Sequence, residues 1–487
     1  MIATETTVQT LKFLVNGKWE GAVGSEVHPV TNPATGEVIA RVPYASAAQV
    51  DRTAHAAHAA FLKWRDVPVV DRVQVLYRYK TLLEKHAEEV ARILTSENGK
   101  TIEDARAEVR RAIQMVEVAC GMPTLMMGES LENVSRGIDS TTIRQPLGVC
   151  AGITPFNFPG MVPMWMFPFA IACGNAFILK PSEKVPMTPT RTAELLQDAG
   201  VPEGVFNLIH GDRISVDALL EHPLVRAVSF VGSTPVARHV YETAARHGKR
   251  VQALGGAKNH LIVMPDANLE KAVEAIMGSA FGAAGERCLA GSVLVPVGAV
   301  AEPLLELLLK KTKSLRVGDG LKAETEMGPL VSGEHRGKVV GYIEKGVAEG
   351  AQPLCDGRGA AQGSPGFFVG PTIFDHVTPQ MTIAKEEIFG PVLSVIRVKT
   401  LDEAIELVNS SRFGNTTSIF TSDGKSAREY ASRIECGMVG VNIGVAAPMA
   451  FFPFSGWKQS FFGDLHAHGK DAVAFYTEQK VVMTRWF

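Results

Sequence analysis

The chain has 487 residues, and at about 150 residues per domain this length predicts two large domains or three smaller ones. Its 49 basic and 51 acidic residues leave a formal net charge of −2, which argues against nucleic acid as the main partner, because that role needs a basic face. Apolar residues make up 46% and charged residues 21%, as in ordinary globular proteins. The 6 cysteines include no C-x-x-C pair, so they form no disulfide framework and indicate a reducing compartment.

The N-terminus and the apolar stretches argue against export and against a membrane partner. The first residues have neither the basic and apolar parts of an export signal nor the arginines of a transit peptide. We therefore expect a cytoplasmic location, although a processed organelle protein fits the same observation. Residues 145–179 lack charge and are long enough to span a bilayer, but their prolines are too closely spaced for one spanning helix. We expect buried strands and turns there.

Helical and strand patterns alternate along the chain. Apolar side chains at helical spacing in residues 73–96 predict one long amphipathic helix. Residues 189–199 and 269–281 predict further helices. Short apolar runs predict buried parallel strands at residues 176–179, 227–231, 261–264 and 292–296. Strands that alternate with helices indicate an α/β fold with mostly parallel sheets.

One strand–helix junction has the parts of a phosphate site, although the sequence contains neither G-x-G-x-x-G nor a P-loop. A predicted strand ends at Val231, and Gly232 permits a tight turn. Thr234 is a good N-cap and Pro235 a good first helical residue, so free N–H groups would face an anion. Many strand–helix junctions share this composition, so the motif alone is weak evidence.

Lys180 and Glu183 follow another predicted strand. An ammonium and a carboxylate can both hydrogen-bond a ribose diol. The carboxylate would repel an added 2′-phosphate, which favours NAD over NADP. A solvated turn is the more common explanation of such a tetrapeptide.

Cys288 lies between a predicted helix and a predicted strand, in a stretch whose small residues leave room for a substrate. The neighbouring Arg287 is expected to lower the pKa of the thiol and so to increase the thiolate fraction. The other cysteines are interpreted as small buried apolar residues.

Seven motifs in order resemble the NAD-dependent aldehyde dehydrogenase superfamily over nearly the whole chain. They lie at residues 32–37, 155–159, 180–183, 230–234, 285–288, 387–391 and 453–457. Within the superfamily, residues 162–168, 256–260 and 449–458 are similar to the methylmalonate-semialdehyde dehydrogenase family, which is CoA-acylating. The resemblance implies an aldehyde dehydrogenase fold with a Rossmann-like NAD domain, an α/β catalytic domain and a small β oligomerisation element. It also implies a homodimer or homotetramer.

The resemblance further implies domain limits and residue roles. The NAD-binding domain would comprise residues 1–122 and 145–255, the catalytic domain 256–455, and the oligomerisation element 123–144 and 456–487. Cys288 would be the nucleophile, and Asn157 would hold the oxyanion together with the backbone N–H of Cys288. Arg111 and Arg287 would bind a substrate carboxylate, with Arg110 as a neighbouring alternative. No metal site is expected. The residues implied for the NAD site are Thr154, Phe156, Lys180, Glu183, Lys184, Ser233, Gly255 and Glu387.

One departure from the superfamily pattern bears on the acyl acceptor. Hydrolytic members carry a general base in a Glu-Leu-Gly-Gly sequence, where this chain has Ala253 followed by Leu-Gly-Gly, and no acid stands between Glu242 and Asp266. A positioned base is worth about 10²–10⁴-fold, so water should be a slow acceptor, whereas a thiol such as coenzyme A needs less help.

This departure favours NAD-dependent oxidative decarboxylation of malonate or methylmalonate semialdehyde to acetyl-CoA or propionyl-CoA. Breakdown of valine and of pyrimidines such as thymine produces such semialdehydes. The alternative is a hydrolytic aldehyde dehydrogenase that releases a free acid, with a base such as Glu387 supplied from elsewhere. A cysteine hydrolase without redox chemistry and a catalytically silent binding protein are two further hypotheses.

Overall fold

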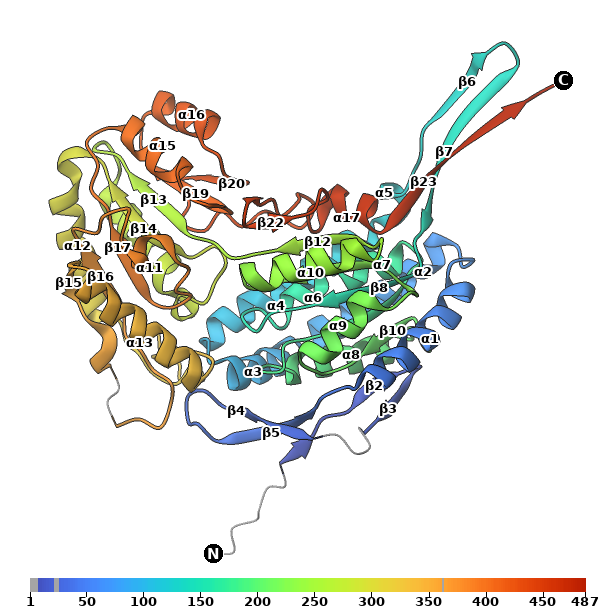
Figure 1. The fold of residues 1–487 in the computed structure, drawn as a ribbon, viewed down its shortest axis with the longest axis horizontal. Coiled ribbons are helices and arrows are strands. Elements are labelled where there is room, and N and C mark those ends of the chain that lie inside the picture. Colours follow the sequence, from blue (N-terminus) through green and yellow to red (C-terminus); the bar gives the residue numbers. More distant parts are fainter. Residues whose placement is uncertain (1–7, 22–25, 361–362) are drawn as a thin grey trace, which may run out of the picture.

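The computed structural model describes residues 8–21, 26–360 and 363–487. Residues 1–7, which make up most of the segment used for the export prediction, lie outside the described residues. Two large α/β units lie side by side, and a slender β arm projects from one of them (Figure 1). Within the described ranges, no helix has both the length and the hydropathy of a membrane span.

The first unit is built on an eight-stranded sheet whose central strands are parallel. The uncharged run forms buried strands of this unit, as predicted, namely β8 (Val149–Ile153) and β9 (Ala176–Lys180). Between them, where turns were expected, it forms the short helices α6 (Met161–Met164) and α7 (Phe167–Ala172). The strand order is β22 (Phe461–Phe462), β12 (Arg250–Leu254), β11 (Val225–Val231), β8 (Val149–Ile153), β9 (Ala176–Lys180), β10 (Phe206–Leu208), β2 (Phe13–Val15) and β3 (Lys18–Glu20).

Helices cover both faces of this sheet (Figure 1). They are α1 (Ala47–Trp64), α2 (Val69–Lys85), α3 (Ala87–Asn98), α4 (Ile102–Cys120), α5 (Met122–Leu125), α8 (Met187–Asp198), α9 (Arg213–Glu221) and α10 (Thr234–Arg246). The prediction of one helix over residues 73–96 is wrong, because the chain leaves helical geometry at His86 (φ −104°, ψ 14°). The His86 N–H caps α2 through Leu82 O at 3.0 Å, while its ring contacts Glu89 in the first turn of α3 at 2.7 Å.

The second unit contains a seven-stranded, mostly parallel sheet with its own apolar core. The strand order is β15 (Gln352–Cys355), β16 (Thr372–Asp375), β17 (Val392–Val395), β14 (Gly291–Pro296), β13 (Asn259–Val263), β19 (Thr416–Phe420) and β20 (Met438–Val441). Its helices are α11 (Leu269–Phe281), α12 (Ala301–Ser314), α13 (Gly333–Ala348), α14 (Thr382–Lys385), α15 (Leu401–Asn409) and α16 (Gly424–Arg433). The predicted strands at residues 176–179, 227–231, 261–264 and 292–296 and the two predicted helices are all confirmed to within a few residues.

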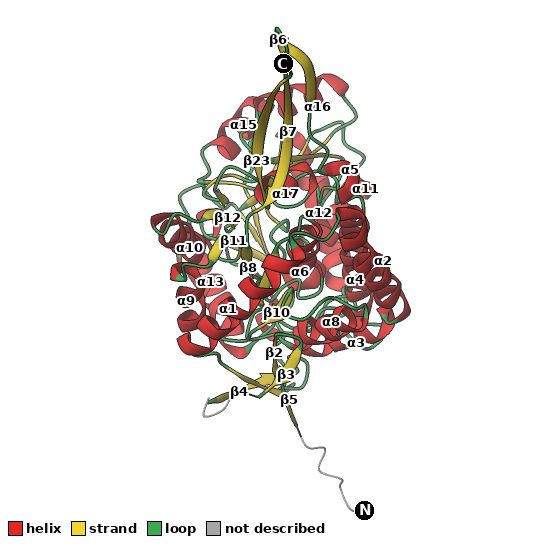
Figure 2. Cartoon of the chain, turned by 90° about the vertical axis from the view of Figure 1, so that its right-hand side faces the viewer, coloured by secondary structure: helices red, strands yellow, loops and turns green. Residues whose placement is uncertain are grey.

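The arm is a three-stranded antiparallel sheet in the order β23 (Thr477–Arg485), β7 (Ile138–Pro146) and β6 (Ser130–Ser135). Figure 2 shows it extending from the body opposite the small sheet of β1 (Gln9–Thr10), β5 (Val38–Pro43) and β4 (Val27–Thr31). Within residues 456–487, β23 joins the arm, whereas β22 pairs with β12 and β21 (Trp457–Lys458) pairs with β18 (Phe413–Gly414). Helix α17 (Gly469–Phe475) leads into β23.

Candidate active site

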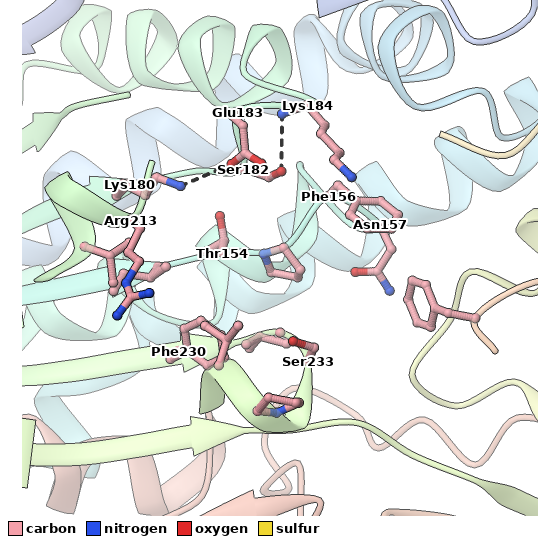
Figure 3. A pocket seen from close by; sticks show the side chains of 18 of the residues that line it. Thr154, Phe156, Asn157, Lys180, Ser182, Glu183, Lys184, Arg213, Phe230 and Ser233 are labelled. Atoms are coloured by element: carbon pink, nitrogen blue, oxygen red, sulfur yellow. Dashed lines mark hydrogen bonds and ion pairs between the residues drawn. The ribbon is translucent and has the colours of Figure 1, made fainter. Parts of the chain in front are cut away.

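A cavity of about 860 Å³ is lined by residues of both α/β units (Figure 3). Lys180 and Ser233 line it from the first unit, and His335 and Glu387 line it from the second. The sequence-predicted residues that meet at this cavity come from six separate segments of the chain. They are Thr154, Phe156, Asn157, Lys180, Glu183, Lys184, Ser233, Gly255, Cys288 and Glu387.

The cofactor end of the cavity, defined here by Thr154, Lys180, Glu183 and Ser233, is formed where strands of the eight-stranded sheet end. Lys180 is the last residue of β9, and its Nζ lies 3.4 Å from Glu183 Oε2. Thr154 follows β8, and its Oγ1 is buried without a hydrogen-bond partner. In Figure 3, Lys180 and Glu183 lie at one side of the cavity and Asn157 at the other. The carboxyl ends of parallel strands therefore bring a charged pair and an unpaired hydroxyl to one edge.

Helix α10 directs its first turn at this end. Thr234 is not the N-cap as predicted: Ser233 is the N-cap, and the helix starts at Thr234, one residue earlier than expected. The Thr234 hydroxyl instead accepts the Gly256 N–H at 2.8 Å, which ties the helix start to the loop after β12. The Ser233 side chain makes no capping bond, so the N–H groups of this turn have no side-chain acceptor there.

The thiol end of the cavity, defined by Cys288 and Asn157, is built from loops. Cys288 is partly exposed, and its carbonyl accepts bonds from Asn259 Nδ2 at 2.9 Å and Asn415 Nδ2 at 2.8 Å. The chain reaches it through Ala283, Ala284 and Gly285, all in the left-handed region with φ of 49°, 52° and 71°. A Cβ on Gly285 would lie 2.3 Å from Gly390 O, so only glycine fits there.

The thiol is protonated in the free protein. Burial and, to a smaller extent, the nearby Glu387 carboxylate raise the pKa of Cys288 to about 12, while Arg287 opposes this rise only weakly. Arg287 lowers the pKa of the thiol, as predicted, but its effect is smaller than that of burial, so the thiolate fraction does not increase. The charge of Arg287 is also compensated, because its guanidinium donates to Asp104 Oδ1 at 2.6 Å.

One face of α4 holds the loops around the thiol end. Asp104, Glu108 and Arg111 are spaced i, i+4, i+7 and therefore share a face. Asp104 binds Arg287, next to Cys288. Glu108 accepts the N–H groups of Gly160 and Met161 at 2.8 and 3.0 Å. Arg111 donates to the Pro448 carbonyl at 3.1 Å.

A buried ion pair completes this support. Lys100 Nζ lies 2.7 Å from Glu108 Oε2 and donates to the backbone oxygen of Asn157 at 2.6 Å. Asn98 Nδ2 donates to the Phe156 carbonyl at 3.0 Å. Three buried polar side chains, those of Asn98, Lys100 and Glu108, thus hold the loop that contains Asn157.

The two arginines predicted for a substrate carboxylate do not line the cavity. Arg111 has neutral acceptors, including Gln114 Oε1 at 3.1 Å and the Pro448 carbonyl, so no carboxylate neutralises its charge in these contacts. Arg287, in contrast, already forms an ion pair with Asp104. Of the two, Arg111 is therefore the better placed to attract a further anion.

The position of the missing base is buried in a strand. Ala253 lies in β12, opposite Phe230 on one side and Phe462 on the other. Among the described residues that line the cavity, the carboxylates are Glu183, Asp212, Glu334 and Glu387. Burial raises the pKa of Glu387 to about 7, and its Oε1 accepts the Ala257 N–H at 2.9 Å.

Sequence reasoning missed several lining residues. Phe389 belongs to the motif at residues 387–391, so a signal for it was present. His335 and Lys338 line the cavity from α13 at helical spacing, but no motif marks them. Tyr44 comes from a loop and Arg213 from the first turn of α9, and neither carries a local pattern that marks it.

The chain is similar to known proteins over nearly its whole length. The model of the aldehyde dehydrogenase family matches residues 19–482. Malonate-semialdehyde dehydrogenase 2 of Geobacillus kaustophilus is 55% identical over 482 residues, covering 99% of this chain and 100% of the relative. Malonate-semialdehyde dehydrogenase of Halalkalibacterium halodurans is 52% identical over 485 residues, covering 100% of both.

Solved structures match as well. Methylmalonate-semialdehyde dehydrogenase of Oceanimonas doudoroffii superposes with a TM-score of 0.97 at 49% identity, covering 98% of this chain and 99% of that one. A structure from Sinorhizobium meliloti 1021 that is complexed with NAD has a TM-score of 0.97 at 47% identity and covers 99% of both chains.

Proposed function

The chain belongs to the aldehyde dehydrogenase family, and from this premise we propose that it is an NAD-dependent, CoA-acylating dehydrogenase of malonate and methylmalonate semialdehyde. The products would be acetyl-CoA and propionyl-CoA. The names of the relatives support the substrate class. A single observation supports acyl transfer to CoA: this chain has the apolar Ala253 at the position where hydrolytic aldehyde dehydrogenases have their general base.

The cofactor end fits NAD. The unpartnered Thr154 hydroxyl lines the cavity, the open first turn of α10 suits a diphosphate, and the Lys180–Glu183 pair suits a ribose diol without a 2′-phosphate. Bound NAD would supply the hydride acceptor. Phe156, Lys184, Gly255 and Glu387 are the further residues that we assign to this site.

Cys288 is the proposed nucleophile. The thiol first releases its proton to solvent, and the thiolate then adds to the aldehyde carbon. The carbonyl oxygen becomes an alkoxide that the Asn157 amide and the Cys288 N–H stabilise. Loss of hydride from this adduct leaves a thioester on Cys288. Asn157 is well suited to its role because Lys100 and Glu108 fix its loop, so the amide needs little reorganisation as charge develops.

Arg111 and Arg287 are proposed to hold the substrate carboxylate. That carboxylate lies β to the thioester carbonyl, so its C–C bond can break with release of CO₂, and the electron pair moves onto the carbonyl oxygen as an enolate at the oxyanion site. Protonation at carbon gives the shorter acyl group. The CoA thiolate then adds to the thioester carbon, a new C–S bond forms, and Cys288 leaves as its thiolate.

One observation favours the hydrolytic alternative. Glu387 has a pKa of about 7, so at neutral pH it is partly ionised and able to accept a proton from water. If it turned towards Cys288, the thioester would yield a free acid instead of a CoA ester.

Product analysis distinguishes the two. NADH formation from malonate semialdehyde is followed with and without CoA, and the products are identified by mass spectrometry. CoA-dependent turnover to acetyl-CoA and CO₂ is expected. CoA-independent turnover to a free acid would contradict the proposal, and loss of that activity in Glu387→Gln would identify the base.

The domain limits and the oligomerisation element are part of the same proposal. Exposed apolar side chains on the arm, among them Leu131, Val481 and Met483, support its pairing with another copy to form a dimer or tetramer. Light scattering on the intact protein and on a Val481→Glu, Met483→Glu variant tests this, since a smaller assembly is expected for the variant.

A further inference from the structure

A basic groove adjoins the active-site cavity along α13. It has a volume of about 610 Å³. Lys338 lines both the groove and the cavity, so the two are continuous at this side chain. The groove is lined by Lys338, Gly341, Tyr342, Lys345, Gln380, Thr382, Lys385 and Glu386.

The charge in the groove is mainly positive. Lys338, Lys345 and Lys385 are exposed, and within the described part of the chain none of them forms an ion pair. The Glu386 carboxylate forms an ion pair with Arg412, with 2.7 Å between Oε2 and Nη2. The Glu349 carboxylate lies near Lys345 and Lys385 but is hydrogen-bonded to the N–H and hydroxyl of Thr382.

The groove follows one face of a helix that begins at the cavity. His335 and Lys338 line the cavity, and Lys338, Gly341, Tyr342 and Lys345 line the groove at three- to four-residue steps. From His335 to Lys345 the helix rises about 15 Å. A Cβ on Gly341 would meet no atom within 4 Å, so this glycine leaves the floor of the groove open.

We propose that this groove binds the phosphate groups of coenzyme A, with Lys345 and Lys385 as their main partners, while the pantetheine arm runs along α13 past Lys338 to Cys288. This inference rests on the proposed function and deepens it. The arm has about twelve bonds between its sulfur and its phosphate-bearing oxygen, equivalent to four extended residues or about 14 Å. This length matches the helical path from the groove to the cavity.

The location also lets two nucleotides share one active site. The residues that we assign to NAD line the cavity and not the groove, whereas of the groove residues only Lys338 also lines the cavity. Lysines act as point charges for phosphate, and Tyr342 offers an aromatic face beside them.

Reversing the charge of the groove lysines tests whether they bind the phosphate groups of CoA. In a Lys345→Glu, Lys385→Glu variant, KM for CoA should rise about tenfold or more, while KM for pantetheine, which lacks the phosphates, should rise far less. Lys310→Glu is the matched control, because this exposed lysine lies on α12 and does not line the groove. Raising the salt concentration should weaken CoA binding more in the wild type than in the variant.

Gly341→Leu tests the same site without changing charge. Because the position is an open helical site, the substitution should fold, and the added side chain should block the groove. We expect a rise in KM for CoA with a melting temperature that is unchanged or slightly higher, because leucine is a better helix former than glycine.

Calorimetric titration of CoA into the wild type separates the two proposals. CoA-dependent turnover with the same KM in both groove variants would overturn the inference and leave the proposed function intact. Absence of CoA-dependent turnover, together with CoA binding that the variants weaken, would overturn the function alone. The groove would also be excluded as the CoA site if CoA gave no binding heat. The same holds if CoA competed with NAD and the variants bound CoA with unchanged affinity.

Discussion

The two ends of the active-site cavity are built in different ways. At the cofactor end, the functional groups stand at the ends of parallel strands and at a helix start, within a few residues of the element that positions them. At the thiol end, Cys288 and Asn157 lie on loops whose shape depends on distant polar partners, such as Asn415 for the first and Lys100 for the second. Sheet geometry determines one end, and buried hydrogen bonds determine the other.

This difference teaches where each end is vulnerable. A substitution at the cofactor end should remove one contact and change affinity by a modest factor. A substitution in the support of the thiol end should shift a loop and change both stability and rate. The following experiments compare the two ends, beginning with the largest expected effect.

Cys288→Ala should reduce NADH formation by about 10⁴-fold or more, because no other group at the thiol end can form the thioester. Affinity for NAD should stay within about twofold, since the cofactor end is unchanged. Steady-state rates and calorimetric titration of NAD measure the two effects. Cys355→Ala, at a partly buried site on β15, is the control, and turnover that survives in Cys288→Ala would exclude Cys288 as the nucleophile.

Breaking the ion pair beneath Asn157 should affect both stability and rate. Lys100→Met leaves the buried Glu108 without its cation, which should lower the free energy of unfolding by about 3–5 kcal/mol. The Lys100→Met, Glu108→Gln double variant should recover part of the stability but not of kcat, because the Asn157 carbonyl still lacks its donor. Urea unfolding and kcat are measured. The exposed Lys310→Met variant, on α12, is the control and should change neither. A Lys100 variant with normal stability would refute the support role.

Arg111→Ala should raise KM for malonate semialdehyde by about 10- to 100-fold, the range expected for charge-assisted hydrogen bonds, and KM for propanal little. The neighbouring, exposed Arg110→Ala should have no such selectivity. An equal rise in KM for malonate semialdehyde and for propanal would show that Arg111 does not recognise the substrate carboxylate.

Alkylation of the free enzyme by iodoacetamide measures the raised pKa of Cys288. Because the thiolate reacts and the pKa is about 12, the rate should rise about tenfold per pH unit from pH 7 to 10 without a plateau. A plateau below pH 8 would mean that the thiol is activated without cofactor. Peptide mapping confirms that Cys288 is the alkylated residue.

Thr154→Val should have the smallest effect and the clearest signature. The hydroxyl is buried and unpartnered in the free protein, so its removal should not lower stability, while the affinity for NAD should fall about three- to tenfold. Thr95→Val is a matched control, since its hydroxyl is also buried without a partner but does not line the cavity. Unchanged NAD affinity in Thr154→Val would mean that the cofactor does not use this hydroxyl.

Local sequence patterns were sufficient for most of the fold and for the cofactor end. The strands that end at Lys180 and Val231 follow from short apolar runs, and the residues after them follow from strand–helix chemistry. The break at His86 was missed because the helical spacing of apolar residues continues across it, although the backbone of His86 itself is not helical. The helix start was misplaced by one residue because Ser233 and Thr234 are both good N-caps.

The thiol end was identified by motif but not explained by it. Asp104, 183 residues from Arg287 in the chain, neutralises the charge that was expected to activate Cys288. Asn415, which holds the Cys288 carbonyl, is 127 residues away. No local pattern reveals such pairings. The Asp104–Arg287 pair exists only after the two α/β units have packed against each other, and the Asn415–Cys288 bond exists only after the seven-stranded sheet has formed. For the same reason His335 and Lys338 were missed.

The shared face of α4 has a consequence for thermal motion. A helix moves largely as a rod, and the Cys288, Asn157 and Pro448 loops are all bonded to this one rod through Asp104, Glu108 and Arg111. Displacement of α4 therefore carries the three loops in the same direction. Their spacing should therefore fluctuate less than their individual positions, so the Cys288 thiol, the Asn157 amide and the Arg111 guanidinium should stay aligned as the protein moves.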